Sequence, residues 1–315
     1  MRAGTTAATA AADAPLWRRW ELPTLAVAAA IYLGWGALTW WYHALPWWLV
    51  LPLGGYLLAW HGSLQHEAVH GRPFGRLAAQ ILVFPSLWLW LPFTHYRWTH
   101  LTHHRDEDLT WPGVDPESNY MLPERWVRLH PAQRAFFAAL RTLAGRMVLG
   151  PPYAVAMVWW NDARAILRGD RAMLRHWLGH IPGAAVVVAW VAGVCDIPLG
   201  AYFLLFVYPG IALTLLRSYG EHVPDRRVAH RTAITEAEAP LALLFLNNNL
   251  HVVHHADPRI AWYDLPAAYR AGREAYRRSN GGLVYRGYRE IARRFLFARR
   301  DGPVHPEPGV FGTER

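Results

Sequence analysis

Two pairs of apolar segments limit most strongly how this chain can fold. The first pair covers about 22–42 and 44–63, and the second covers about 177–196 and 198–216. Each segment is long enough to cross a bilayer as a helix, and the connection within each pair is short. Trp40, Trp41, Trp47 and Trp48 flank the first connection, as is typical of a membrane–water interface. The sequence therefore predicts an all-α membrane protein with four transmembrane helices in two hairpins.

The arginines predict which side of the membrane the rest of the chain occupies. All 32 basic residues are arginines, and neither hairpin turn contains one. Because basic residues concentrate on the cytoplasmic side of membrane proteins, both termini and the segment 64–175 are expected in the cytoplasm. The formal net charge of +9 then belongs to that face. No nucleic-acid recognition module accompanies the charge, so we expect no nucleic-acid binding.

The remaining segments suggest one domain between two tails. Residues 1–16 are rich in alanine and threonine and are predicted to be a disordered tail, and 301–315 are predicted to be a second tail. Residues 17–300 are predicted to form a single membrane domain. The apolar stretch 77–93 contains Pro85 and Pro92, which disfavour a straight spanning helix, so we expect an interfacial or re-entrant element there. The same prediction applies to 147–160.

Four clusters with histidine lie on the predicted cytoplasmic side. They read HEAVH at 66–70, HLTHH at 100–104, GEH at 220–222 and HVVHH at 251–255. Residues three or four apart share a face of a helix, so each box presents its imidazoles along one stripe. Converging imidazoles are typical of Zn, Cu, Fe and Ni sites. The predicted metal ligands are His66, His70, His100, His103, His104, His222, His251, His254 and His255.

The number of histidines favours two metal ions over one. One ion cannot use nine ligands, and a catalytic zinc usually has three protein ligands and a water. The only cysteine, Cys195, excludes thiolate zinc sites and iron–sulfur clusters within this chain. A membrane metal transporter would need ionisable residues near the middle of the membrane, and the four apolar segments have almost none.

The boxes resemble those of a known family. HEAVH, HLTHH and HVVHH are similar to the three histidine boxes of the membrane fatty acid desaturase/hydroxylase superfamily, and the resemblance covers roughly 45–270. It implies four transmembrane helices under a cytoplasmic helical cap that holds a di-iron site, with the nine histidines as ligands. The stretches 104–120, 217–227 and 247–255 look most similar to a bacterial branch of hydrocarbon oxygenases that includes the rhizopine oxygenase. The resemblance thus implies a bacterial inner-membrane protein.

Polar neighbours of the boxes are predicted to support the ligands. Glu67, Asp106 and Glu221 are expected to accept a hydrogen bond from a ligand's second ring nitrogen, with a solvated charge as the alternative. Asn247 and Asn248 precede His251 by four and three residues, so either is predicted as a weak ligand or as a donor beside one. In acyl-CoA desaturases an asparagine stands four residues before the lone histidine, where this chain has Ser218.

The resemblance also implies a reaction class. We expect an O2-dependent di-iron oxidoreductase that desaturates an acyl chain of a lipid or fatty acid. The alternative is a hydroxylase or oxygenase that uses the same centre on a lipid, a hydrocarbon or another apolar substrate. No haem-binding HPGG segment is present, so electrons are expected from a separate ferredoxin-like carrier and its reductase. Trp88, Trp90 and Trp98 are predicted either to line an apolar tunnel or to anchor the protein at the interface.

Overall fold

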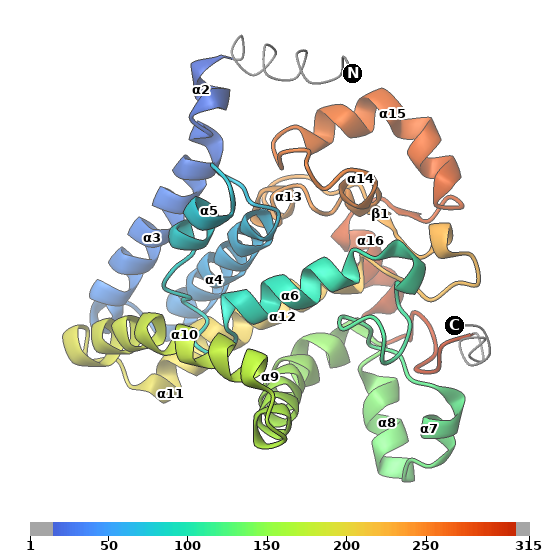
Figure 1. Ribbon diagram of the computed structural model, residues 1–315, viewed down its shortest axis with the longest axis horizontal. Helices are drawn as coiled ribbons and strands as arrows, with labels where there is room; N and C mark the ends of the chain where they lie inside the picture. Colours follow the sequence, from blue (N-terminus) through green and yellow to red (C-terminus); the bar gives the residue numbers. More distant parts are fainter. Residues whose placement is uncertain (1–14, 307–315) are drawn as a thin grey trace.

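The computed structural model describes residues 15–306, apart from the side chain of Asp106, and is built almost entirely of helices (Figure 1). Its long helices are α3 (Leu22–Trp40), α4 (Trp47–Val69), α6 (Phe93–His103), α9 (Leu143–Leu167), α10 (Arg171–Val188), α12 (Tyr208–Tyr219) and α15 (Leu265–Ser279). The shorter helices are α2 (Leu16–Arg19), α5 (Arg76–Leu82), α7 (Pro123–Val127), α8 (Pro131–Ala139), α11 (Leu199–Tyr202), α13 (Leu241–Leu244), α14 (His251–Ala256) and α16 (Tyr288–Phe295). Strands β1 (Ile234–Thr235) and β2 (Val284–Tyr285) pair in parallel.

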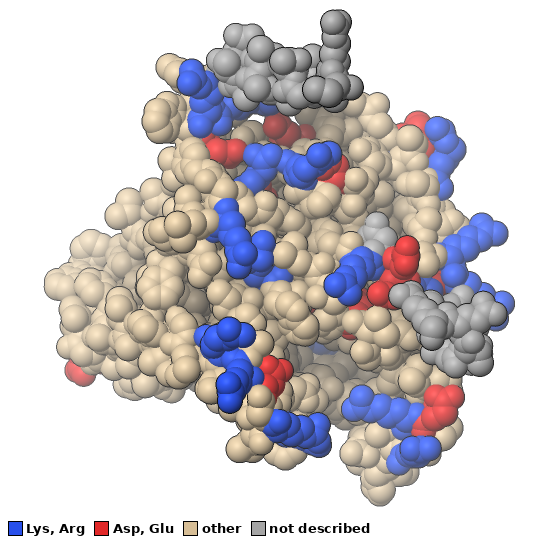
Figure 2. Space-filling model, viewed as in Figure 1, with Lys and Arg blue, Asp and Glu red and all other residues tan. Residues whose placement is uncertain are grey.

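Three helical stretches in the described chain are long and apolar enough to cross a membrane. They are Leu22–Trp40, Arg171–Val194 and Leu199–Tyr219, which overlap the first, third and fourth predicted spans. Helix α4 overlaps the second predicted span but continues to Val69. Its polar residues from His61 onward lower its mean hydropathy, so the second predicted span stays a prediction. In Figure 2, most of the surface over α10 and α11, at the lower left, is free of charged side chains.

The second hairpin contains two wide π-helical segments. Ala189–Val194 continues α10, and Phe203–Val207 joins α11 to α12. The second π segment ends just before Pro209, whose missing N–H removes one regular helical hydrogen bond. The π segment Phe203–Val207 packs closely against α4 because Gly54 lies at their contact. A Cβ atom there would come within 2.8 Å of the carbonyl oxygen of Leu205.

The two apolar stretches with internal prolines behave differently. Residues 77–93 do not form one straight helix, because α5 ends at Leu82 and the cis peptide bond at Pro85 precedes the turn that leads to α6. Residues 147–160, by contrast, lie within the continuous helix α9, which has Pro151 and Pro152 in its interior. Helix α9 is not one of the three stretches above, so its interfacial placement stays a prediction.

The predicted tails are described only in part, since 1–14 and 307–315 lie outside the described residues. The prediction that the C-terminal tail starts at 301 is corrected, because 301–306 pack against the domain. Asp301 Oδ1 accepts a hydrogen bond of 2.6 Å from Nε of the buried Arg141. The backbone N–H of His305 donates to the carbonyl of Met121 at 3.0 Å. Because burial of Arg141 requires a charged partner, this segment belongs to the core of the domain.

Candidate metal centre

The four histidine clusters lie on, or directly after, four different helices. The first box closes α4, the second box ends α6, the lone His222 follows α12 after Gly220 and Glu221, and the third box forms α14. Box spacings of three and four residues turn the imidazoles of each helix toward one side. Most of these rings are buried, with His100 and His251 each at 1% exposure.

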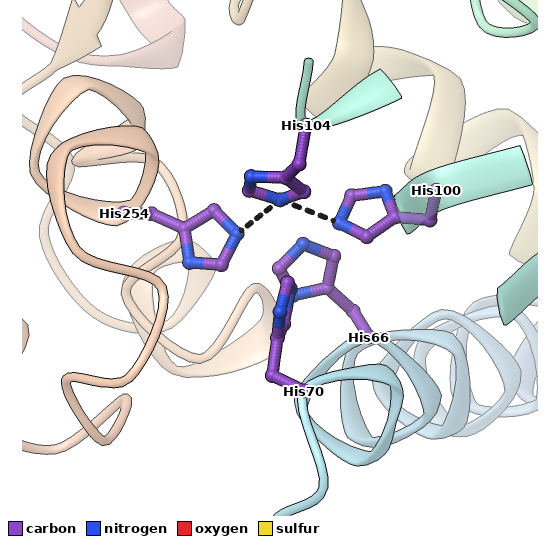
Figure 3. Close-up of side chains that lie close together, drawn as sticks. All are labelled: His66, His70, His100, His104 and His254. Carbon is purple, nitrogen blue, oxygen red and sulfur yellow. Dashed lines mark hydrogen bonds between the residues drawn. The ribbon is translucent and has the colours of Figure 1, made fainter. Parts of the chain in front are cut away.

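The structure brings all nine predicted ligands into two groups. In each group the nitrogen atoms available for a metal all lie within 4.8 Å of one another. Figure 3 shows the five rings of the first group, which come from α4, from the end of α6 and from α14 and face a common point. The first group contains His66, His70, His100, His104 and His254, and the second contains His103, His222, His251 and His255.

Hydrogen bonds to carboxylates fix the protonated nitrogen of two rings. Nδ1 of His103 donates to Asp115 Oδ1 at 2.9 Å, and Nδ1 of His100 donates to Glu117 Oε1 at 2.9 Å. An ionised carboxylate only accepts hydrogen bonds, so the proton of each neutral ring resides on Nδ1. The lone pair of each Nε2 therefore points to the opposite side, into its group. This orientation by a carboxylate is typical of metal-binding histidines.

Carbonyl oxygens orient two more rings of the second group in the same way. Nδ1 of His222 faces the carbonyl of Arg231 at 3.3 Å, and Nδ1 of His251 faces Asn248 Oδ1 at 3.2 Å. Their Nε2 atoms consequently carry lone pairs. His222 Nε2 lies 2.9 Å from His251 Nε2 and 3.0 Å from His103 Nε2. Two lone pairs that face each other at these distances repel unless a proton or a metal cation lies between them, so the donor set fits a metal ion.

The first group repeats this convergence. His104 Nε2 lies 3.0 Å from His100 Nε2 and 3.0 Å from His254 Nε2 (Figure 3). The Nε2 atom of His70 is buried and has no hydrogen-bond partner in the described structure. A buried imidazole nitrogen without a partner is costly, and coordination to a metal ion removes that cost. The first group therefore fits a second metal ion.

Burial and neighbouring charges set the protonation of the rings. Burial holds the pKa of most ligands well below the usual range, so they are neutral and can donate a lone pair; this applies to His100, His222, His251 and His254. His103 differs. Burial lowers its pKa, but the carboxylates of Glu117 and Asp115 outweigh burial and raise the pKa to about 9. The surroundings of His103 thus favour a positive charge, from a proton or a metal cation.

Comparison with known proteins decides the family. The family model described as fatty acid desaturase matches residues 42–288, which include all nine histidines. The chain belongs to the fatty acid desaturase family. Among curated proteins no match was found. Family membership makes the chain an enzyme of the desaturase and oxygenase kind, and its three apolar helices agree with a membrane protein.

Two of the predicted supporting residues lie beside the box histidines. Asn248 Nδ2 donates to Glu221 Oε1 at 3.0 Å and lies 3.5 Å from His66 Nε2, while its Oδ1 accepts from His251. Asn248 therefore touches one histidine of each group. Glu221 lies 3.4 Å from Nδ1 of His251, and its charge is offset by Arg217 at 3.1 Å. Both residues thus help to orient His251.

The other predicted neighbours lie elsewhere. Glu67 Oε1 accepts the backbone N–H of Trp262 at 3.2 Å, and Asn247 Nδ2 donates to the carbonyl of Trp262 at 3.0 Å. The backbone of Asn247 is left-handed, with a positive φ of 56°. Their predicted contacts with ligands are therefore corrected. The side chain of Asp106 lies outside the described part of the chain.

Two carboxylates of the site were not predicted. Asp115 and Glu117 hold His103 and His100, yet they stand 12 and 17 residues from those rings in the sequence. No helical periodicity links positions so far apart across a Pro- and Gly-containing loop. The available signal was the acidic pair in DPE at 115–117, directly after the second box. Asp115 also accepts the backbone N–H groups of Thr110 and Glu117, so it shapes the loop as well.

A cavity of about 290 Å³ lies beside the first group. Trp88 and Trp90 form part of its wall, which supports the tunnel alternative for these two residues, whereas Trp98 is 54% exposed. Glu117 contributes to the same wall and binds His100. Residues Gln65, Tyr96, Asn119 and Arg217 add polar groups. The cavity therefore reaches the first group through Glu117, while no box histidine is among its described lining residues.

Proposed function

We propose that this desaturase-family enzyme is an O2-dependent di-iron membrane oxidoreductase that desaturates an acyl chain of a lipid or fatty acid. The observation that carries the proposal is the convergence of nine imidazoles in two groups. Two ions account for all nine donors, and imidazole suits iron. Two bound irons with O2 would supply the oxidising power for an unactivated C–H bond, which no side chain of the chain provides.

The protein's own contribution is to hold the substrate and to exclude water. The cavity beside the first group reaches Tyr96, whose ring centre lies 5.6 Å from that of His100. Trp88 closes the wall over Gly62, where a Cβ atom would come within 2.5 Å of the indole. A chain segment in this cavity would be fixed next to Glu117, which binds His100 of the first group, and would be partly shielded from solvent. Such positioning decides which carbon reacts.

The location and the electron donor complete the proposal. The absence of arginine from both hairpin turns supports an active site on the cytoplasmic face. The resemblance of the sequence to a bacterial branch of the family supports a bacterial inner-membrane protein. A groove of about 910 Å³ between α15 and α16 is lined by several arginines, including Arg277, Arg289 and Arg293. A positive surface of this kind attracts an acidic carrier, so we propose a ferredoxin-like donor with a separate reductase.

One observation favours the alternative reaction. Besides its tryptophans, the cavity presents the polar side chains of Gln65, Asn119 and Arg217. A wall of this mixed character also suits a compact substrate with a polar group, which the same centre would hydroxylate. The two reactions share the metal centre and differ in the product.

Product analysis by mass spectrometry separates the two reactions. Purified protein loaded with iron would receive defined lipids, O2, a reduced ferredoxin and its reductase. Desaturation predicts a product that lacks two hydrogen atoms and carries a new double bond, and no product without the carrier. An oxygenated product without a new double bond would reject desaturation in favour of the alternative. Reactions with the His254→Ala protein provide the background.

A further inference from the structure

An arginine-lined groove lies outside the metal centre. It has a volume of about 570 Å³ and runs between α5, α6 and the first turns of α10. Four arginines line it, namely Arg76, Arg97, Arg105 and Arg175. No aspartate or glutamate is among the described residues of its lining. In Figure 2, arginine side chains lie on the surface over α5 and α6, next to surface without charge.

The positive charges of this groove are not neutralised within the described structure. Nε of Arg97 is buried and has no hydrogen-bond partner there, and burial together with Arg76 lowers the pKa of Arg97. Nε of Arg175 donates only to the backbone carbonyl of Arg171. Among the described residues, none of the four arginines forms an ion pair with a carboxylate. Clustered guanidinium groups repel one another, and a phosphate offsets this repulsion with charge-assisted hydrogen bonds.

The groove borders an apolar surface suited to lipid chains. Leu77 and Ile81 on α5 are 73% and 64% exposed, and Leu178 and Ile181 on α10 are 54% and 56% exposed. Helix α10 begins one of the three stretches that could cross a membrane. The arginines therefore lie near the end of this stretch, on a groove whose helices α5 and α10 also carry these exposed apolar side chains. Arginines at this level hold anionic headgroups.

We propose that this groove binds the phosphate headgroup of an anionic phospholipid, whose acyl chains lie along the exposed apolar side chains of α5 and α10. A soluble phosphate compound would use the arginines but would leave these apolar side chains uncovered. The bound lipid would stabilise α6, the helix that carries His100, because Arg97 precedes His100 by three residues on this helix. The inference goes beyond the proposed reaction and does not depend on it.

Lipid retention tests this proposal. The full-length protein would be reconstituted in phosphatidylcholine with or without phosphatidylglycerol, and bound lipid would be measured by native mass spectrometry after detergent washing. Wild type should retain phosphatidylglycerol and unfold at a higher temperature in its presence. The double variant Arg97→Gln/Arg175→Gln should lower retention at least about tenfold and lose the thermal shift, because charge-assisted hydrogen bonds are lost. The matched control Arg289→Gln/Arg293→Gln, in the α15–α16 groove, should retain phosphatidylglycerol and show the thermal shift as wild type does.

Two results would overturn the proposal. Unchanged retention of phosphatidylglycerol in the double variant would show that the lipid binds elsewhere. An equal thermal shift with soluble glycerol phosphate in phosphatidylcholine alone would assign the groove to a soluble phosphate ligand. If the double variant does not fold, Arg105→Gln serves instead, because Arg105 is exposed, and its retention should still fall below that of wild type.

Discussion

Replacement of His254 with alanine is expected to abolish lipid oxidation and to reduce bound iron from about two ions per chain to about one. His254 is 3% exposed, and its Nε2 lies 3.0 Å from Nε2 of His104. Its ring also packs against those of His66 and His70, with ring centres 4.6 and 4.8 Å apart. Loss of this ring opens the first group and leaves the second group intact. Iron analysis and product analysis of the purified variant measure both effects.

The matched control is His95→Ala. His95 is also buried and lies on α6, but its Nδ1 faces Asp162 Oδ2 at 3.0 Å, away from both groups. Asp162 keeps a hydrogen bond from Trp177 in this variant, so the change should cost stability without loss of iron. Unchanged iron content in His254→Ala would remove His254 from the ligand set.

Asp115→Asn is expected to lower the affinity of the second group for its metal ion about 10–100-fold. This is the usual effect of removing a carboxylate that is hydrogen-bonded to a histidine ligand. Asp115 is 4% exposed and accepts the Nδ1 proton of His103. Without the carboxylate charge, the Nε2 lone pair of His103 binds a metal ion less strongly. The orientation of the His103 ring is also less well fixed. A titration of the metal-free protein with Fe²⁺, followed by calorimetry, should show one unchanged and one weakened binding step.

Glu117→Gln provides the complementary experiment, since Glu117 holds His100 of the first group. Glu117→Gln should weaken mainly the binding step of the first group, with a smaller effect on the second group, because Glu117 Oε2 also lies 3.9 Å from His103 Nε2. Asp115 also accepts the backbone N–H of Thr110 at 2.8 Å, so collapse of the loop would weaken both steps together. Two unchanged steps, or two equally weakened steps, in Asp115→Asn would contradict the assigned role.

The clustering of the nine histidines could be predicted because their signal is local. Spacings of three and four residues place imidazoles on one face of a helix wherever the helix lies. The partition into two groups could not be predicted, because it depends on how the helices meet. In HLTHH, His100 and His104 belong to the first group and His103 belongs to the second. In HVVHH, His254 belongs to the first group, and His251 and His255 belong to the second.

The errors arise where long-range contacts decide the geometry. Glu67 and Asn247 are adjacent to the boxes in sequence, yet both bind the backbone of Trp262. Asp115 and Glu117 are distant in sequence, yet a loop returns them to the rings of α6. Membership of the fatty acid desaturase family, in contrast, could be predicted from the three boxes and their order, and the family model over residues 42–288 confirms it.

Elemental analysis of the purified full-length protein tests most directly whether the nine histidines hold two irons. Both groups supply imidazole nitrogens from buried or half-buried rings, and the described chain brings no thiolate to either group. We expect about two irons per chain after expression in iron-replete cells, and no stoichiometric zinc. One zinc per chain with no iron would contradict the di-iron assignment.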